Sequence, residues 1–228
     1  MLKSVELNNV TIAGDTRFDR VSEILKRDNS LSFMSAFKQG KFCFVAGSTW
    51  PEDENIIIDY INENIHPIQF VIAPHTIKEK HIQAIKKSIN KSVICYSEID
   101  NSNIEDYDVV IIDTIGLLTK IYSYADVAFV GGAFATGLHN TLEPAVFGIP
   151  VIIGPNFDGF AEAEELVKLK GVISIKNSDE FRAQVNSCFE NEEFTYRTGR
   201  INLEYIKEKS GATQKVMNVI TSVFKPYY

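Results

Sequence analysis

The sequence predicts an α/β protein, a Rossmann-like three-layer α/β/α sandwich with a parallel sheet. Short runs of Val, Ile and Phe recur along the chain, and segments with helical periodicity separate them. Runs that are apolar on both faces and joined by helical crossovers are typical of parallel strands buried between two helical layers. The composition agrees, because 45% of the 228 residues are hydrophobic, which is ordinary for a globular protein.

Seven apolar runs are predicted as strands: KFCFVAG, IQFVIAP, SVICYS, DVVIIDT, DVAFVGG, PVIIGP and GVISI. Ser48 and Thr49 precede Pro51 and three acids, which predicts a hydroxyl-capped helix start. The segment NNVTIAGDTRFDRVSEILKRDNS predicts a short strand followed by a helix. Further helices are predicted over residues 77–90, 116–124, 140–147 and 160–169, and from about residue 179 onward.

The charge and the cysteine content exclude several classes of function. A net charge of −7 and a pI near 5.2 argue against binding a nucleic-acid backbone. Two of the three cysteines, Cys43 and Cys95, lie inside apolar runs, which predicts buried thiols. The odd, sparse set predicts a reducing compartment, and its spacing predicts no zinc site. No apolar run approaches the ~20 residues of a membrane span, and the first residues lack a signal-peptide pattern, so a cytoplasmic location is expected.

Candidate site residues follow the predicted strands, because ligands of open parallel sheets bind beyond the carboxyl ends of the strands. The Asp-x-Asp pattern at 106–108 precedes its strand and therefore falls at the opposite edge, where a solvated turn is expected rather than a metal site. The residues at the carboxyl edge are Gly47, Ser48, Thr49, His75, Asp113, Thr114, Gly131, Gly132 and Asn156.

The stretch AFVGGAFATGLHNTLEPAVFGIPVIIGP leads from one predicted strand to the next. Gly131 and Gly132 allow a sharp turn and close approach of a ligand to the backbone. A helix starting near Asn140 would point its N–H groups into the same gap, where a phosphate can bind. Asn140 and Glu143 also have capping-box spacing, so mutual capping and ligand binding are both open. His139 and His75 are likewise ligand contacts or surface residues.

Taken together, the stretches FVAGSTWPEDE, APH, IDTIGLL, YSYADVAFVGG, GLHNTLEPAVFGIPVIIGP and SGAT resemble the C-terminal half of the 3-deoxy-D-manno-octulosonic acid (Kdo) transferase family of lipopolysaccharide biosynthesis. The resemblance implies a GT-B glycosyltransferase of two Rossmann-like domains, of which this chain is the donor-binding one. Residues 1–34 are then an inter-domain segment and entry helix, and residues 35–228 are the nucleotide-sugar-binding domain with C-terminal helices.

The resemblance further implies inverting transfer of Kdo from CMP-Kdo to the lipid A precursor, without a cofactor or metal. The family's N-terminal domain accepts the lipid, touches the membrane and supplies the general base. No catalytic residue is therefore expected in this chain, which should be inactive alone. The full-length protein is expected in the cytoplasm, peripheral on the inner face of the inner membrane.

Carried over residue by residue, the resemblance places one set of residues on the donor side and gives Glu143 the nucleotide ribose. The chain departs from the family at Pro74, where an Arg is usual, at Leu117, where an acid is frequent, at Leu138, where a Gly is usual, and at Gly159-Phe160 in place of Asn-Phe. The implied donor residues are Gly47, Ser48, Thr49, His75, Asp113, Thr114, Gly116, Gly131, Gly132, His139, Asn140 and Glu143.

Besides a pure interaction module, which would leave the glycine-rich edge unexplained, two alternative classes are open. One is another GT-B enzyme, such as a UDP-sugar transferase or a UDP-GlcNAc 2-epimerase. The other is a non-catalytic flavodoxin-like module, for example one with Asp113 as a phosphoacceptor, although the chain lacks the acidic cluster after the first strand that magnesium binding would require.

Overall fold

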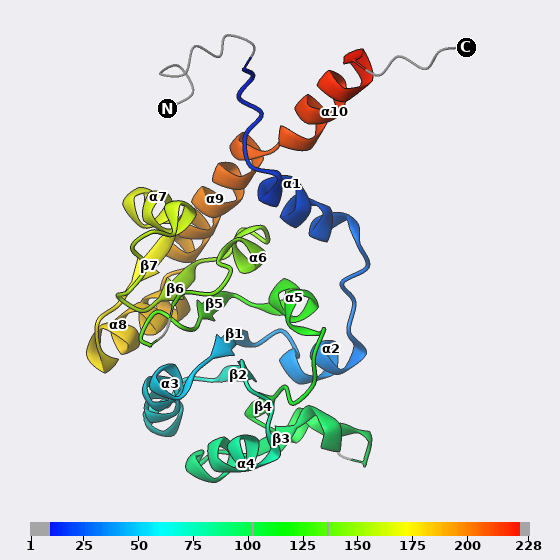
Figure 1. Cartoon of the computed structure of the whole chain (residues 1–228). Coiled ribbons are helices and arrows are strands. Elements are labelled where there is room, and N and C mark those ends of the chain that lie inside the picture. Colours follow the sequence, from blue (N-terminus) through cyan, green and yellow to red (C-terminus); the bar gives the residue numbers. More distant parts are fainter. Residues whose placement is uncertain (1–9, 102, 136, 224–228) are drawn as a thin grey trace.

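The computed structural model describes residues 10–101, 103–135 and 137–223, which form one sheet of seven parallel strands. The strand order is β3-β4-β2-β1-β5-β6-β7 (Figure 1). Each predicted run forms one strand, so the sheet prediction is confirmed. The bounds are β1 Phe42–Thr49, β2 Ile68–Pro74, β3 Val93–Cys95, β4 Val109–Ile111, β5 Val127–Val130, β6 Val151–Ile153 and β7 Val172–Ser174.

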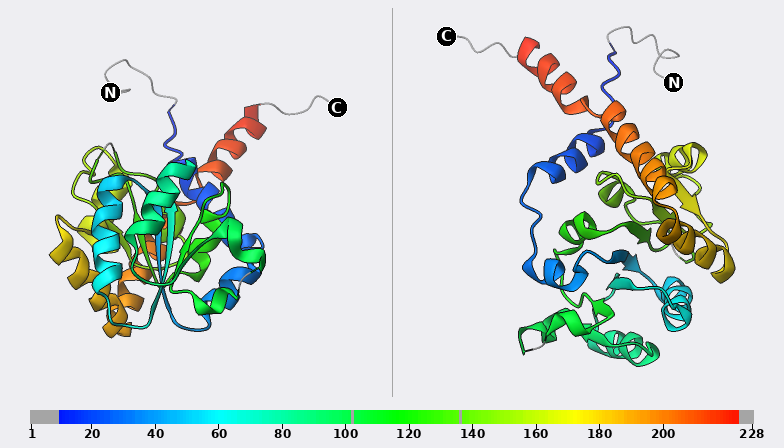
Figure 2. Two further views of the ribbon diagram at one scale, coloured as in Figure 1. Left: turned by 90° about the horizontal axis from the view of Figure 1, so that it is seen from below. Right: turned by 180° about the vertical axis from the view of Figure 1, so that it is seen from behind.

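Helices cover both faces of the sheet and confirm the three-layer fold (Figure 1). One layer holds α3 Pro51–Glu63, α4 Glu79–Ser88 and α8 Ser178–Glu190. The other holds α1 Thr16–Ser22, η2 Glu23–Lys26, α2 Ser32–Lys38, α5 Leu118–Ile121, η5 Tyr122–Tyr124, α6 Leu142–Ala145, α7 Ala161–Leu169 and α9 Glu192–Lys209. The remaining elements are η3 Tyr96–Asn101, η4 Ile104–Asp106 and α10 Ala212–Val223, and α10 extends away from the sandwich (Figure 2).

The alternation of side chains along each strand divides the core into two. In β1, Phe44 and Ala46 pack under α3 and α8, whereas Cys43 and Val45 pack under α2 and α5. A strand buried in this way on both sides needs the unbroken apolar run that the sequence shows. All three cysteines are buried and free, which confirms the prediction of burial for Cys43 and Cys95, and burial raises the pKa of Cys95 to about 11.

The strand order reverses between β1 and β5. From β1 the chain adds β2 beside it, then β3 at the edge of the sheet and β4 between β2 and β3, and it then crosses back to place β5 on the other side of β1. Such a switch leaves a crevice at the carboxyl ends of the two strands, where ligands of these sheets bind. The Gly131 N–H donates to the Gly47 carbonyl at 3.0 Å and closes the bottom of this crevice.

Three local predictions were wrong. α3 begins at Pro51, but its N-cap is Trp50, and neither Ser48 nor Thr49 caps it. The helix predicted over 140–147 is only the four-residue α6: it begins at Leu142, and after Ala145 the chain continues as a turn to Gly148, at φ +71°. No strand forms in the described residues before α1, and residues 1–9 lie outside the described part. The same part contains no helix with the length and apolarity to cross a bilayer.

Candidate functional site

Asp53 joins the two loops of the crevice. Its side chain is fully buried, and Oδ2 accepts the Trp50 and Gly132 backbone N–H groups, each at 2.9 Å. Burial raises the pKa of this carboxyl, and its Oδ1 has no partner among the described residues. The start of α3 and the loop after β5 are therefore fixed to each other through one acidic side chain.

The two glycines after β5, Gly131 and Gly132, pack closely against other parts of the protein. A Cβ on Gly131 would lie 2.7 Å from Asp53 Oδ2 and 2.8 Å from the Thr49 Cα. Gly132 has φ +98°, and a Cβ there would lie 3.1 Å from the His139 ring. Both residues are buried, so what they allow in this structure is loop-to-loop packing. The sequence predicts that a ligand approaches these glycines, but in the structure protein atoms surround them.

The residues at the end of β1 also face protein. A Cβ on Gly47 would collide with the Tyr122 hydroxyl, and Ser48 adopts a left-handed φ of 54°. The Thr49 side chain is buried and donates to Glu54 Oε1 at 3.0 Å. Of the predicted donor residues, Gly47 and Thr49 shape the edge rather than present side chains to it, whereas Ser48 is half-buried.

Trp50, His75 and His139 form a stack of rings at the edge. The Trp50 indole N–H donates to His139 Nε2 at 2.9 Å, with the two rings 11° from coplanar. His75 stacks on both, with ring centroids 4.7 Å from Trp50 and 4.6 Å from His139. The structure thus brings together the two predicted histidines, and it adds Trp50. The signal for Trp50 was its place between the first strand and Pro51.

The indole contact defines the state of His139. An indole N–H only donates, so Nε2 must accept, which leaves the ring neutral with its proton on Nδ1. Burial, together with the charge of the nearby His75, lowers the pKa of His139 in the same direction. The geometry and the electrostatics therefore both favour a neutral His139 near pH 7.

Replacing Trp50 by Phe tests this assignment. The Trp50→Phe variant would keep an aromatic ring under His75 but lose the indole donor, so we expect the pKa of His139 to rise and the Nδ1–H form to lose its preference. Nitrogen-15 NMR of the imidazole through a pH titration measures both. A His139 that titrates identically in the two proteins would contradict the assignment.

Asp113 and Thr114 lie at the turn after β4. Asp113 Oδ1 accepts the Ser97 N–H at 3.0 Å and its Oδ2 accepts the Ser97 hydroxyl, so this carboxylate ties the turn to η3. Thr114 is half-buried beside it. Gly116, at φ +94°, faces open space at the end of the same turn.

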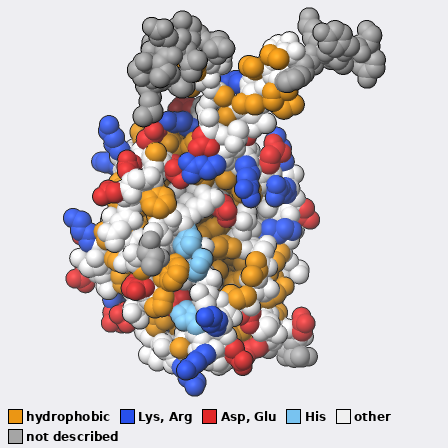
Figure 3. Space-filling model, viewed as in Figure 1, with side chains coloured by type: hydrophobic (Ala, Val, Ile, Leu, Met, Phe, Trp, Pro, Cys, Tyr) orange, Lys and Arg blue, Asp and Glu red, His pale blue; other side chains and the backbone are white. Residues whose placement is uncertain are grey.

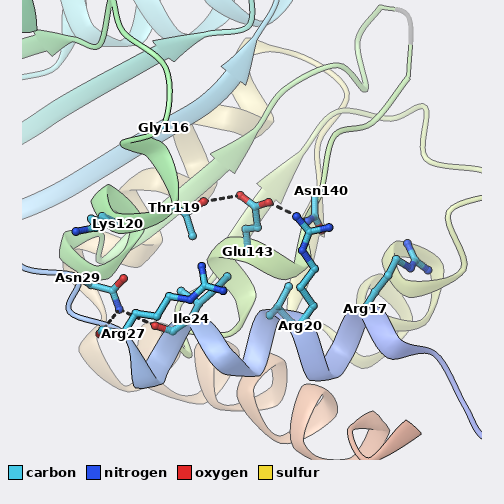
Figure 4. A pocket seen from close by; sticks show the side chains of 11 residues that line it. Arg17, Arg20, Ile24, Arg27, Asn29, Gly116, Thr119, Lys120, Asn140 and Glu143 are labelled. Carbon is cyan, nitrogen blue, oxygen red and sulfur yellow. Dashed lines mark hydrogen bonds between the residues drawn. The ribbon is translucent and has the colours of Figure 1, made fainter. Parts of the chain in front are cut away.

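A pocket of about 320 Å³ lies between the α1–η2 segment and the α5 and α6 helices (Figure 4). Three predicted residues line it: Gly116, Asn140 and Glu143. Glu143 Oε2 accepts the Thr119 hydroxyl at 3.0 Å, and Oε1 accepts the Asn140 amide at 3.1 Å. Each oxygen keeps a further acceptor position, so the carboxylate can also accept hydroxyls of a ligand.

Asn140 and Glu143 contact each other, but not as a capping box. The N-cap of α6 is Thr141, which has no side-chain cap bond, and the Asn140 side chain accepts the Leu142 N–H at 3.1 Å just before the helix. Glu143 accepts from the Asn140 side-chain amide rather than from its backbone. This contact holds the Glu143 carboxylate at the pocket. Because α6 has only four residues, the phosphate site expected at its N-terminus has little helix behind it.

Sequence reasoning missed the basic wall of the pocket. Arg17, Arg20 and Arg27 from the α1–η2 segment and Lys120 from α5 all line it. Arg17 is engaged, because it pairs with Glu162 at 2.8 Å and with Asp15. Lys and Arg side chains gather over α1 and α5 on the face shown in Figure 3. Three arginines within eleven residues, in an acidic chain, were the available signal.

The described residues contain no group of three or more His, Cys, Asp or Glu side chains placed to hold a metal. Asp106 and Asp108 precede β4 at the opposite edge from the pocket, as their order in the sequence predicts. Asp108 there accepts the Ser92 hydroxyl at 2.7 Å.

This seven-stranded parallel architecture resembles the C-terminal domain of GT-B glycosyltransferases. No protein-family model matches the chain. It is similar to the 3-deoxy-D-manno-octulosonic acid transferases of Haemophilus influenzae, at 29% identity over 96% of the chain and 52% of that protein, and of Rickettsia conorii, at 28% identity over 96% of the chain and 47% of that protein. The likeness to Kdo transferases that the sequence predicts is thereby confirmed, and the chain spans about half the length of these relatives.

Solved structures give the same fold. The C-terminal CMP-Kdo binding domain of WaaA from Acinetobacter baumannii aligns with a TM-score of 0.67 and 18% identity, over 84% of this chain and 97% of that one. Anabaena HepE in complex with UDP and glucose aligns with a TM-score of 0.60 and 14% identity, over 85% of this chain and 53% of that one. At these identities the structural likeness establishes the fold.

Proposed function

We propose that the chain is the donor-binding domain of an inverting glycosyltransferase that transfers Kdo from CMP-Kdo to the lipid A precursor. The observation that carries this proposal is the pocket in which Glu143 faces a basic wall across the carboxyl edge. A carboxylate suits the ribose hydroxyls of a nucleotide, and the basic wall suits its phosphate. The similarity to Kdo transferases selects CMP-Kdo among nucleotide sugars.

The chemistry requires a base from outside this chain. An acceptor hydroxyl attacks the anomeric carbon of Kdo while the bond from that carbon to the CMP phosphate breaks, and the hydroxyl proton passes to a general base. CMP leaves with the bonding electron pair, and basic side chains stabilise its growing charge. The base, the lipid acceptor and the contact with the inner face of the inner membrane belong to the second domain that the resemblance implies. Residues 1–34 would then lead from that domain into the nucleotide-sugar-binding domain of residues 35–228.

Of the predicted donor residues, we assign direct contact to Gly116, Asn140 and Glu143. The ring stack of His75 and His139 is assigned to the same edge. The other predicted donor residues are assigned a structural role in holding the loops at this edge: Gly47, Ser48, Thr49, Asp113, Thr114, Gly131 and Gly132. We propose no metal and no cofactor for donor binding.

Incubation of residues 1–228 with CMP-Kdo and the lipid A precursor tests the proposal. Saturation-transfer NMR is expected to reveal contact with the cytidine and Kdo protons of the donor, while mass spectrometry detects no Kdo-bearing lipid. Formation of that product would place the base within this chain. An absence of saturation transfer from the protein to the donor would contradict donor binding.

A UDP-sugar enzyme is the second candidate, because a UDP complex of the same fold aligns with the chain. Selective binding of uridine nucleotides would favour it. The flavodoxin-like alternative has less support, because the Asp113 carboxylate is engaged by Ser97 through both oxygens.

A further inference from the structure

Arg20 and Arg27 carry positive charge that the described protein does not neutralise. No ion pair or hydrogen bond of either side chain forms with another described residue. The acids nearest Arg20 in sequence are engaged elsewhere, since Asp19 accepts the Gly211 and Thr213 N–H groups and Glu23 pairs with Lys26 at 2.6 Å. Two exposed guanidinium groups therefore border the pocket with their donors unused.

The segment that presents these arginines is anchored. Phe18, Val21 and Ile24 are buried on its inner side. Beyond η2, the Asn29 amide donates to the Ile24 carbonyl at 2.8 Å and to the Arg27 carbonyl at 3.3 Å, which fixes the turn that holds Arg27. An arginine on a fixed backbone loses less freedom on binding than one on a mobile loop.

The basic groups and the Glu143 carboxylate line the pocket without pairing. No ion pair joins Glu143 to either arginine among the described residues, although all three border one cavity (Figure 4). A ligand with an anion at one end and hydroxyls at the other would satisfy both sides. A nucleoside monophosphate has this pattern, and guanidinium groups are suited to phosphate oxygens.

We propose that Arg20 and Arg27 hold the phosphate of the nucleotide whose ribose the proposed function already assigns to Glu143. This inference rests on the proposed function and deepens it. Lys120 from α5 lines the same pocket and adds a further positive charge.

Comparing CMP with cytidine isolates the phosphate contribution. Calorimetric titration of residues 1–228 is expected to give tighter binding of CMP than of cytidine. In the double variant Arg20→Gln/Arg27→Gln, we expect CMP to bind about tenfold or more weakly, near the level of cytidine, with cytidine binding unchanged. Lys26→Gln is the matched control, because Lys26 lies on the same segment, pairs with Glu23 and does not line the pocket.

The outcomes separate the two proposals. If the double variant keeps the full preference for CMP over cytidine, the arginine assignment is wrong and the proposed function stands. If the unsubstituted chain binds neither compound, the proposed function fails. In that case the arginine site is tested with inorganic phosphate, by following the Nε–H NMR signals of Arg20 and Arg27. A shift of these signals on phosphate addition supports the site, and an unchanged spectrum overturns it.

Discussion

Replacing Glu143 by Ala is expected to weaken CMP binding by about 10- to 100-fold, the cost of losing hydrogen bonds to a charged acceptor. In the structure its carboxylate is held by Thr119 and Asn140 and keeps acceptor positions free at the pocket. Those two partners line the pocket, so water can replace the carboxylate as their partner and the fold should persist. Calorimetric titration with CMP measures the change, and circular dichroism checks the fold.

Two controls sharpen the Glu143 result. Glu143→Gln keeps one acceptor oxygen and should lose less affinity than the Ala variant. Glu105→Ala removes an exposed acid from η4 at the opposite edge and should leave binding unchanged. An Ala variant at position 143 that binds CMP as tightly as the unsubstituted chain would remove Glu143 from the binding site.

Gly131→Ala is expected to lower the free energy of unfolding by at least about 3 kcal/mol. The new methyl group would meet the Ser48 carbonyl oxygen, Asp53 Oδ2 and the Thr49 Cα. Two of these neighbours are backbone atoms, which cannot move aside as a flexible side chain can. Displacing Asp53 would also leave buried N–H groups without an acceptor. Urea denaturation followed by fluorescence measures the loss.

Gly40→Ala provides the contrast for Gly131. Gly40 has φ +73° with nothing within 4 Å of its missing Cβ, so only backbone strain of about 1–2 kcal/mol is expected. If Gly131→Ala proved no more destabilising than Gly40→Ala, the tight junction between the β1 and β5 loops would not exist as described.

The sheet was predictable from the sequence because each strand is buried on both faces, which leaves an unbroken apolar run. Helix starts were less predictable, because Trp50 rather than a hydroxyl residue occupies the N-cap of α3. Gly131 and Gly132 were identified from the sequence, but their contacts depend on Asp53, 78 and 79 residues earlier in the chain. No local pattern reports such a pairing.

The residues that line the pocket were also only partly predictable from the sequence. Asn140 and Glu143 were identified from their spacing and from the family resemblance. Arg20 and Arg27 were not, because they precede the sheet in sequence and reach the pocket only when α1 packs against α6, α9 and α10. Residues that follow strands can be assigned to an edge from order alone, whereas residues on a packed helix require the tertiary structure.

The most direct test of the account is calorimetric titration of residues 1–228 with CMP and with UMP, in buffer that contains a chelator. The account predicts that CMP binds and that UMP binds more weakly. Preferential binding of UMP would contradict it and would assign the chain to a UDP-sugar enzyme.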